Sequence, residues 1–240
     1  LARSFTQAEV EMLDRAIDRG LGAAGEANSR KRGSLSERFE SGGRGPGTVS
    51  GGIGDPGGVS YGTYQLSSRT GTAARFIDNE GASWALDFGK AAPGSAAFSR
   101  CWREVAEREP DGFGQAQHAF IERTHYRPAV AKVFEQTGLD LDARHPAVRD
   151  AAWSVAVQHG GAAGILVDAV RAVEGLSSPD DCDAFDRTLL ETIYDKRSAY
   201  VLRVADRANT AAARTLRSVT RNRYPAELEA ALAMLDETPA

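Results

Sequence analysis

Apolar residues recur at helical spacing along most of the chain. Between residues 5 and 22 they lie three or four positions apart, behind a capping box formed by Thr6 and Glu9, as expected for an amphipathic helix. The same period predicts further helices near 69–79, 94–108, 113–136, 146–173, 180–207 and 224–236. Alternating patterns typical of strands are nearly absent, so the pattern predicts a mostly helical protein.

One segment departs from this pattern. Nine of the nineteen residues from Gly42 to Ser60 are glycine, and the segment lies between Phe39–Glu40 and the run Tyr61–Leu66. Glycine adopts positive φ without steric cost, so such a segment can turn sharply several times. We expect it to form a small lobe on a helical body, with residues 1–35 as an N-terminal helix and joint and residues 36–240 as the main domain.

Composition narrows the classes of function. The chain has 42% hydrophobic and 26% charged residues, a net charge of −4 and a pI near 5.7. This balance disfavours nucleic acid as a partner, although basic patches occur at 29–33 and 217–223. No apolar run approaches the ~20 residues that span a membrane, so we expect no membrane insertion. The sequence begins at Leu1, and we expect a processed chain or an excised module.

Two carboxylates flank the glycine-rich segment. Glu40 follows an apolar stretch that would raise its pKa, whereas Asp55 lies in the turn sequence GDPGG, where a carboxylate stays ionised. Glycosidic-bond cleavage uses such a pair, one residue as general acid and the other as base or stabiliser. Spacing alone does not identify them, because 33 acidic residues are scattered through the chain.

The surrounding residues resemble the lysozyme superfamily in two ways. ES at Glu40–Ser41, followed by SYGTYQLS at 60–67, resembles goose-type lysozymes and lytic transglycosylases. GDPGGVSYG at 54–62 resembles the chitosanase branch, in which an upstream glutamate pairs with the aspartate of a Gly-Asp-Gly turn. That match implies Asp55 as base and Ser60 in place of a water-holding threonine. Pro56 and Gly57 replace the glycine–basic pair of that branch.

Downstream segments extend the resemblance to roughly residues 35–225. FGQAQHAFIERTHYRPAV at 113–130 is similar to the chitosanase Gln-Ala-Gln helix, and AVQHGG at 156–161 is similar to its buried helix. IYDKRSAYV at 193–201 and RNRY at 221–224 resemble parts of phage and type VI secretion cell-wall hydrolases.

The resemblance implies an α+β, mostly α, lysozyme-like fold with a helical body and a Gly-rich, partly β lobe flanking a cleft. It implies an enzyme of the muramidase type, secreted or delivered to the periplasm of a target cell, that cleaves the β-1,4 N-acetylmuramic acid–N-acetylglucosamine bond of peptidoglycan. Glu40 would be the acid, Asp55 the base and Ser60 a water-positioning group. No cofactor or metal is expected, because no cluster of ligating residues has metal spacing. A cognate immunity protein is the expected partner besides the glycan strands.

The residues expected to contact the substrate are Ser41, Tyr61, Tyr64, Gln65, His118 and Tyr126. The three tyrosines fit two roles equally well, stacking on sugar rings or packing in the core. His159 precedes a Gly-Gly helix stop and is expected to be structural. Neutral hydrogen-bonding groups, with Arg44, Arg123 and Arg127, favour peptidoglycan over chitosan. The alternative functions are a chitosanase-type hydrolase and a glycan-binding module that has lost catalysis.

Overall fold

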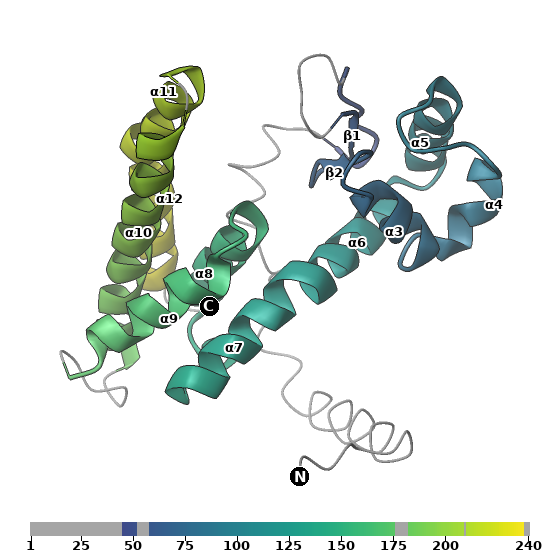
Figure 1. Cartoon of the computed structure of the whole chain (residues 1–240). Helices are drawn as coiled ribbons and strands as arrows, with labels where there is room; N and C mark the ends of the chain where they lie inside the picture. Colours follow the sequence, from purple (N-terminus) through teal and green to yellow (C-terminus); the bar gives the residue numbers. More distant parts are fainter. Residues whose placement is uncertain (1–44, 52–57, 176–181, 209, 238–240) are drawn as a thin grey trace, which may run out of the picture. The chain divides into compact units, whose positions relative to one another are not determined.

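The computed structural model describes residues 45–51, 58–175, 182–208 and 210–237. All of them belong to one compact unit that spans Gly33–Ala240 (Figure 1). The helix predicted over 5–22 and the boundary predicted at residue 35 lie outside the described residues, and both stay predictions.

Helices make up most of the described chain. They are α3 (Thr72–Asp78), α4 (Ala85–Phe88), α5 (Ala96–Arg108), α6 (Pro110–Ile121), α7 (Arg127–Thr137), α8 (Pro146–Gln158), α9 (Ala162–Val173), α10 (Cys182–Arg207), α11 (Thr210–Ser218) and α12 (Tyr224–Asp236), with 3₁₀ turns at Ala82–Trp84 and Leu141–Ala143. The prediction of a mostly helical protein is confirmed. No described helix is both long and apolar enough to cross a membrane.

The helical segment predicted over 146–173 contains two helices. The chain becomes extended at His159 and α9 starts after Gly161, in agreement with the helix stop expected at Gly160–Gly161. The sequence pattern missed helix α11, which lies between two predicted helices. Its run of alanines favours a helix by intrinsic propensity, but the segment is short and Leu216 is its only large apolar residue.

Two π-helical turns interrupt the long helices, and each precedes a proline. Glu122–Tyr126 joins α6 to α7 before Pro128, and Val219–Arg223 joins α11 to α12 before Pro225. A proline inside an α-helix lacks an N–H donor, and its ring clashes with the carbonyl four residues earlier. The wider π turn accommodates this ring, so both helices continue past their prolines.

The glycine-rich region ends in a small antiparallel sheet. Strand β1 (Ser60–Tyr61) pairs with β2 (Leu66–Ser67), with Ser60 opposite Ser67. The other edge of β1 meets the preceding segment through a bridge between Val49 and Tyr61. The expected partly β lobe is therefore present as a very small sheet.

An aromatic cluster joins this lobe to the helices. The Tyr61 ring lies 5.0 Å from that of Phe98 and 5.1 Å from that of Trp102, and Trp102 lies 4.8 Å from Phe113. Tyr61, Trp102 and Phe113 have no exposed surface. Edge-on and tilted pairs at these distances are favourable beyond their buried area, so the sheet is held by its own side chains against α5 and α6.

The remaining helices form a second packing group. Helix α9 packs against α7 and α10, and α10 also packs against α8, α11 and α12. Figure 1 shows α10, α11 and α12 side by side. Three of these helices, α8, α10 and α12, bury polar side chains against one another, as described below.

Gly62 tests how tightly the sheet sits on α6. Its φ is +72°, and an added Cβ would lie 2.2 Å from Gln117 Oε1, whereas Gly71, at φ +76°, has nothing within 4 Å of the same position. We expect Gly71→Ala to lower the free energy of unfolding by about 1–2 kcal/mol through backbone strain. Gly62→Ala should lower it by about 1–3 kcal/mol more, because Gln117 must move. Equal losses in urea denaturation would contradict this packing.

Candidate functional site

The predicted catalytic carboxylates are not among the described residues. Glu40 and Ser41 precede residue 45, and Asp55 falls within 52–57. Their assignment as acid, substrate contact and base therefore stays a prediction. The structure does describe the residues on both sides of the Asp55 segment.

Two serines join the ends of that segment. The Ser60 N–H donates to Ser50 Oγ at 2.8 Å, the Ser50 N–H donates to the Ser60 carbonyl at 2.9 Å, and the two hydroxyls are 3.3 Å apart. The Ser60 side chain is buried. In this position it closes the base of the segment, and its expected contact with a catalytic water stays a prediction.

A second fixed point is the carbonyl of Pro46. It accepts one hydrogen bond from Trp102 Nε1 at 2.7 Å and one from Gln117 Nε2 at 3.1 Å. Gln117 Oε1 in turn accepts from the Thr63 N–H at 3.1 Å, and Gln117 is fully buried. The side-chain amide of Gln117 thus links Pro46, in the glycine-rich segment, to Thr63, just after β1. Gln117 is the second glutamine of the Gln-Ala-Gln run at 115–117, and the motif alone does not predict this role.

Three predicted substrate residues lie together at the edge of the lobe. Tyr64 Oη is 2.8 Å from His118 Nδ1, and the His118 ring stacks on Trp153 at 4.3 Å with an interplanar angle of 11°. Gln65 follows Tyr64, is exposed, and has a φ of +56°. Positive φ is uncommon for a residue other than glycine and often marks functional sites. Gln65 is exposed and Tyr64 and His118 are half-buried, so all three keep some accessible surface; we refer to these three residues as the polar wall.

Tyr61 and Tyr126 do not share that accessibility. Both have no exposed surface. The Tyr61 hydroxyl is 2.9 Å from Ser99 Oγ and accepts from the Gly94 N–H at 2.9 Å, and Tyr126 Oη donates to Asp142 Oδ1 at 2.8 Å. Their rings are core residues in this structure, which is the second of the two roles considered above. An enclosed ring offers no face for a sugar.

A buried polar network lies between α8, α10 and α12. Arg197 and Glu227 have no exposed surface, and Arg197 Nη1 donates to Glu227 Oε2 at 2.8 Å. Arg197 Nη2 donates to Ser154 Oγ at 2.9 Å and to Gln158 Oε1 at 2.5 Å. Arg223 Nε donates to the other Glu227 oxygen at 2.5 Å. Each charge therefore has several partners, which buried ions need to offset desolvation. Sequence reasoning missed this network, because its members are far apart in the chain.

His159 borders the same network. Arg197 Nε donates to His159 Nε2 at 3.2 Å, and the Tyr224 hydroxyl lies 3.1 Å from the same nitrogen. Burial, reinforced by the charges of Arg197 and Arg223, lowers the pKa of His159 to about 3. The ring is therefore neutral near pH 7, and since Nε2 accepts a hydrogen bond, its proton is on Nδ1.

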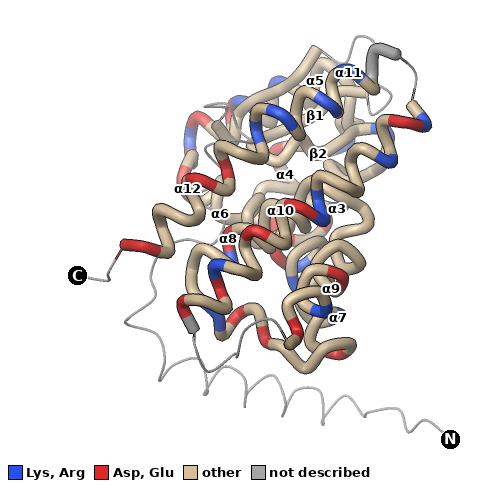
Figure 2. Tube along the Cα trace, turned by 90° about the vertical axis from the view of Figure 1, so that its left-hand side faces the viewer, with Lys and Arg blue, Asp and Glu red and all other residues tan. Residues whose placement is uncertain are grey.

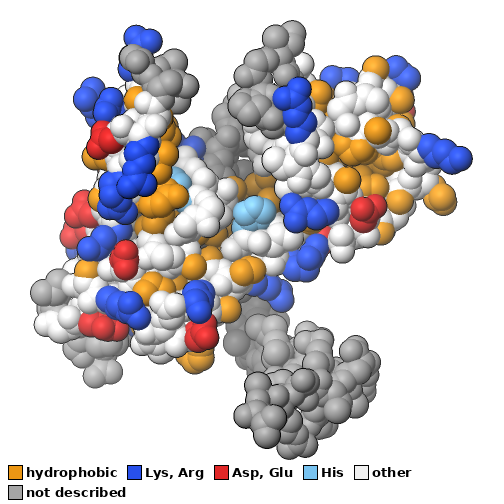
Figure 3. Space-filling model, viewed as in Figure 1, with side chains coloured by type: hydrophobic (Ala, Val, Ile, Leu, Met, Phe, Trp, Pro, Cys, Tyr) orange, Lys and Arg blue, Asp and Glu red, His pale blue; other side chains and the backbone are white. Residues whose placement is uncertain are grey.

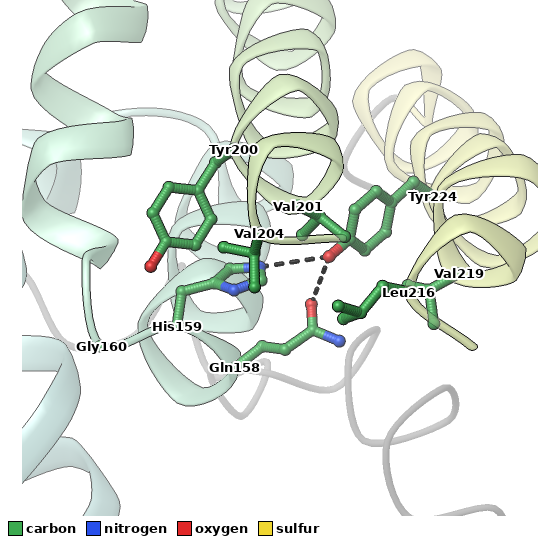
Figure 4. A pocket seen from close by; sticks show the side chains of 9 residues that line it. All are labelled: Gln158, His159, Gly160, Tyr200, Val201, Val204, Leu216, Val219 and Tyr224. Atoms are coloured by element: carbon green, nitrogen blue, oxygen red, sulfur yellow. Dashed lines mark hydrogen bonds between the residues drawn. The ribbon is translucent and has the colours of Figure 1, made fainter. Parts of the chain in front are cut away.

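A pocket of about 260 Å³ opens beside His159 (Figure 4). Its polar side is formed by Gln158, His159 and Tyr224. The ring centroids of Tyr200 and His159 are 5.4 Å apart. The facing wall is apolar and consists of side chains from α10, α11 and the π turn after α11, namely Val201, Val204, Leu216 and Val219. In the part of the chain that the structure describes, no group of three or more His, Cys, Asp or Glu is placed to hold a metal.

Most of the chain matches a known protein family. Residues 32–224 match the family described as "Type VI secretion system spike protein VgrG3-like, C-terminal". The chain is also similar to the type VI secretion system spike protein VgrG3 of Vibrio cholerae serotype O1 (strain ATCC 39315 / El Tor Inaba N16961), with 37% identity over 151 residues. That match covers 63% of this chain but only 14% of the longer relative.

The buried network predicts that removing the charge of Glu227 lowers the free energy of unfolding more than removing the charge of a surface carboxylate. Glu227→Gln removes the charge that Arg197 and Arg223 share, and breaking a buried pair costs about 3–5 kcal/mol. The matched control is Asp87→Asn, because Asp87 pairs with Arg108 at the surface, where such a pair contributes about 0–1 kcal/mol. Chemical denaturation of both variants checks this. A Glu227→Gln loss no larger than that of the control would contradict the network.

His159 predicts a pH dependence of stability. Its pKa in the folded protein is about 3, below its ordinary value of 6.5, so the unfolded chain binds the proton more readily. Above pH 6.5 His159 does not lower the free energy of unfolding. As pH falls from 6.5 toward 3, the preferential protonation of the unfolded chain lowers that free energy by at most about 1.4 kcal/mol per pH unit.

The measurement compares wild type with His159→Gln by urea denaturation from pH 7.5 to 4. The carboxylates titrate in both proteins, so their contributions cancel in the difference. We expect the advantage of wild type to shrink steadily below pH 6.5. Parallel profiles would show that His159 titrates normally.

Proposed function

We propose that this chain, which belongs to the VgrG3-like C-terminal family of type VI secretion system spike proteins, is a glycoside hydrolase of peptidoglycan. It would cleave the β-1,4 bond between N-acetylmuramic acid and N-acetylglucosamine. In a type VI spike protein, such a domain would act as an antibacterial effector in the periplasm of a target cell. The producing cell would then need a cognate immunity protein as a partner.

One observation carries the proposal. Ser50 and Ser60 join the two ends of the segment that contains Asp55, and Gln117 on α6 holds the flanking residues Pro46 and Thr63. The polar wall begins at the next residue of α6, His118. A catalytic group must be positioned by rigid neighbours to act efficiently. A helical body beside a small lobe also supports a lysozyme-like fold, which is part of the proposal.

The proposed chemistry uses two carboxylates. Glu40 protonates the leaving glycosidic oxygen as general acid, and Asp55, if it acts as base, removes a proton from the attacking water. Ser60 would help to hold that water, and Ser41 would contact the glycan near the acid. No metal or cofactor takes part in this scheme.

Peptidoglycan is favoured as substrate by the polar wall. Tyr64, Gln65 and His118 offer hydrogen-bonding groups of the kind that N-acetyl groups use, and this wall contains no carboxylate to meet the amines of chitosan. Arg123 and Arg127, expected to bind substrate carboxylates, instead form ion pairs with Glu80 and Glu122. At these positions a substrate carboxylate would have to compete with an existing acidic partner.

Two alternatives remain distinct from this proposal. A chitosanase-type hydrolase would release glucosamine oligomers from chitosan, and a glycan-binding module without catalysis would bind sacculi without cutting them. Both Glu40 and Asp55 are present in the sequence, which favours an active enzyme.

Glu40→Gln tests the general acid. The amide keeps the size of the side chain but donates no proton, so turnover of purified sacculi should fall by about 10²–10⁴-fold with an unchanged melting temperature. Glu104→Gln on α5 is the matched control, because Glu104 is exposed and should be dispensable. Full lytic activity of Glu40→Gln would remove Glu40 from the mechanism.

A further inference from the structure

The segment from the second half of α10 to the π turn after α11 is rich in basic residues. Residues 196–223 contain eight Lys or Arg and one acidic residue, Asp206, within a chain of net charge −4. One of the eight, Arg197, is buried, and another, Arg223, pairs with Glu227. Basic positions recur along α10, α11 and the π turn in Figure 2, and Figure 3 shows basic side chains gathered around hydrophobic atoms where Figure 1 places α10 and α11. A single-sign field of this kind attracts anions.

Several of these arginines are not used within the fold. Arg217 pairs with Asp206 at 2.8 Å. Over the ranges that the structure describes, Arg203, Arg207, Arg214 and Arg221 form no hydrogen bond or ion pair; Arg203 lies 6.0 Å from the centroid of the Tyr200 ring. Because Tyr200 also lines the pocket beside His159, the basic surface reaches the mouth of that pocket.

Two residues that line the pocket, His159 and Tyr200, each carry a donor without a protein partner among the described residues. His159 carries its proton on Nδ1, since Nε2 accepts from Arg197, and no bond to Nδ1 or to the Tyr200 hydroxyl is present in the described part of the chain. Tyr200 is seated by Gly161, where an added Cβ would lie 3.2 Å from the ring. Donors left unpaired beside apolar walls are the arrangement that ligand pockets use to fix orientation.

These features define the chemistry of the ligand. The pocket of about 260 Å³ is slightly smaller than typical small-molecule sites of about 300–1,000 Å³, so it suits one unit of a polymer. Its walls fit a small apolar group, its donors fit a carbonyl or carboxylate, and its rim fits further negative charge. A short acidic peptide with alanine-sized side chains satisfies all three.

We infer that this pocket and the arginines Arg203, Arg207, Arg214 and Arg221 bind the peptide stem of peptidoglycan. The inference rests on the proposed function and extends it, because it assigns recognition of the stem to a surface separate from the Tyr64–Gln65–His118 wall. Stem carboxylates contact the arginines, and an apolar stem residue enters the pocket beside His159. Arg123 and Arg127 are already paired with acidic side chains, which leaves this basic surface to meet the stems.

The test uses two forms of one substrate. Uncross-linked glycan strands that carry stems are divided, and half are treated with an amidase that removes the stems and leaves the lactyl carboxylate. Binding and rate of strand cleavage are measured for wild type, for Arg203→Glu/Arg221→Glu, and for Val204→Trp, which narrows the pocket at an exposed position. Arg100→Glu on α5 is the control, because Arg100 is equally exposed and lies outside the basic surface.

We expect wild type to bind stem-bearing strands more tightly than stem-free strands. The double charge reversal should weaken binding to stem-bearing strands about tenfold, because two attractive contacts become repulsive, and Val204→Trp should weaken it too. Cleavage of stem-free strands should stay unchanged in both variants, and Arg100→Glu should behave as wild type.

Two outcomes would overturn the inference. Equal wild-type binding to both strands would assign recognition to the lactyl group or to the sugars, and unchanged binding by both variants would place the stem elsewhere. Failure of the proposed function gives a different result, since wild type would then cleave neither substrate. The binding measurement still reports on the pocket in that case.

Discussion

The buried guanidinium of Arg197 is the interaction on which the C-terminal half of the fold depends. A charge with no exposed surface must be fully hydrogen-bonded, and Arg197 achieves this with Glu227 on α12, with Ser154 and Gln158 on α8, and with His159 at the end of α8. The three helices must therefore pack in one arrangement if these hydrogen bonds are to offset the desolvation cost of the buried guanidinium. The same arrangement holds His159 neutral and shapes the pocket beside it.

The small lobe relies on a different device. It has too few strands to be stable alone, so its backbone is tied to α5 and α6 by the side chains of Trp102 and Gln117, which meet at the Pro46 carbonyl. Gln117 Oε1 also accepts a hydrogen bond from the Thr63 N–H. Glycine is needed at position 62 because the Cβ of any other residue would clash with the Gln117 amide. A rigid base of this kind is what a glycine-rich segment requires if it is to hold a catalytic group.

The sequence predicted helices well where apolar spacing was strong and less well elsewhere. It predicted the mostly helical fold and the position of α12, but it missed 210–218, a short helix with a single large apolar residue, Leu216. It left Tyr61 and Tyr126 open between core and substrate, because an aromatic ring beside polar residues has the same pattern in either place. Arg197 and Glu227 could not be paired from sequence, since only the folded helices bring residues thirty positions apart into contact.

The family, the hydrogen-bonded ends of the Asp55 segment and the polar wall are the grounds for our proposal of a cell-wall hydrolase that acts through Glu40 and Asp55. Mass spectrometry of the products released from purified sacculi tests this claim most directly. The account predicts disaccharide fragments from cleavage between N-acetylmuramic acid and N-acetylglucosamine, with chitosan left largely intact. Intact sacculi together with rapid release of glucosamine oligomers from chitosan would contradict it.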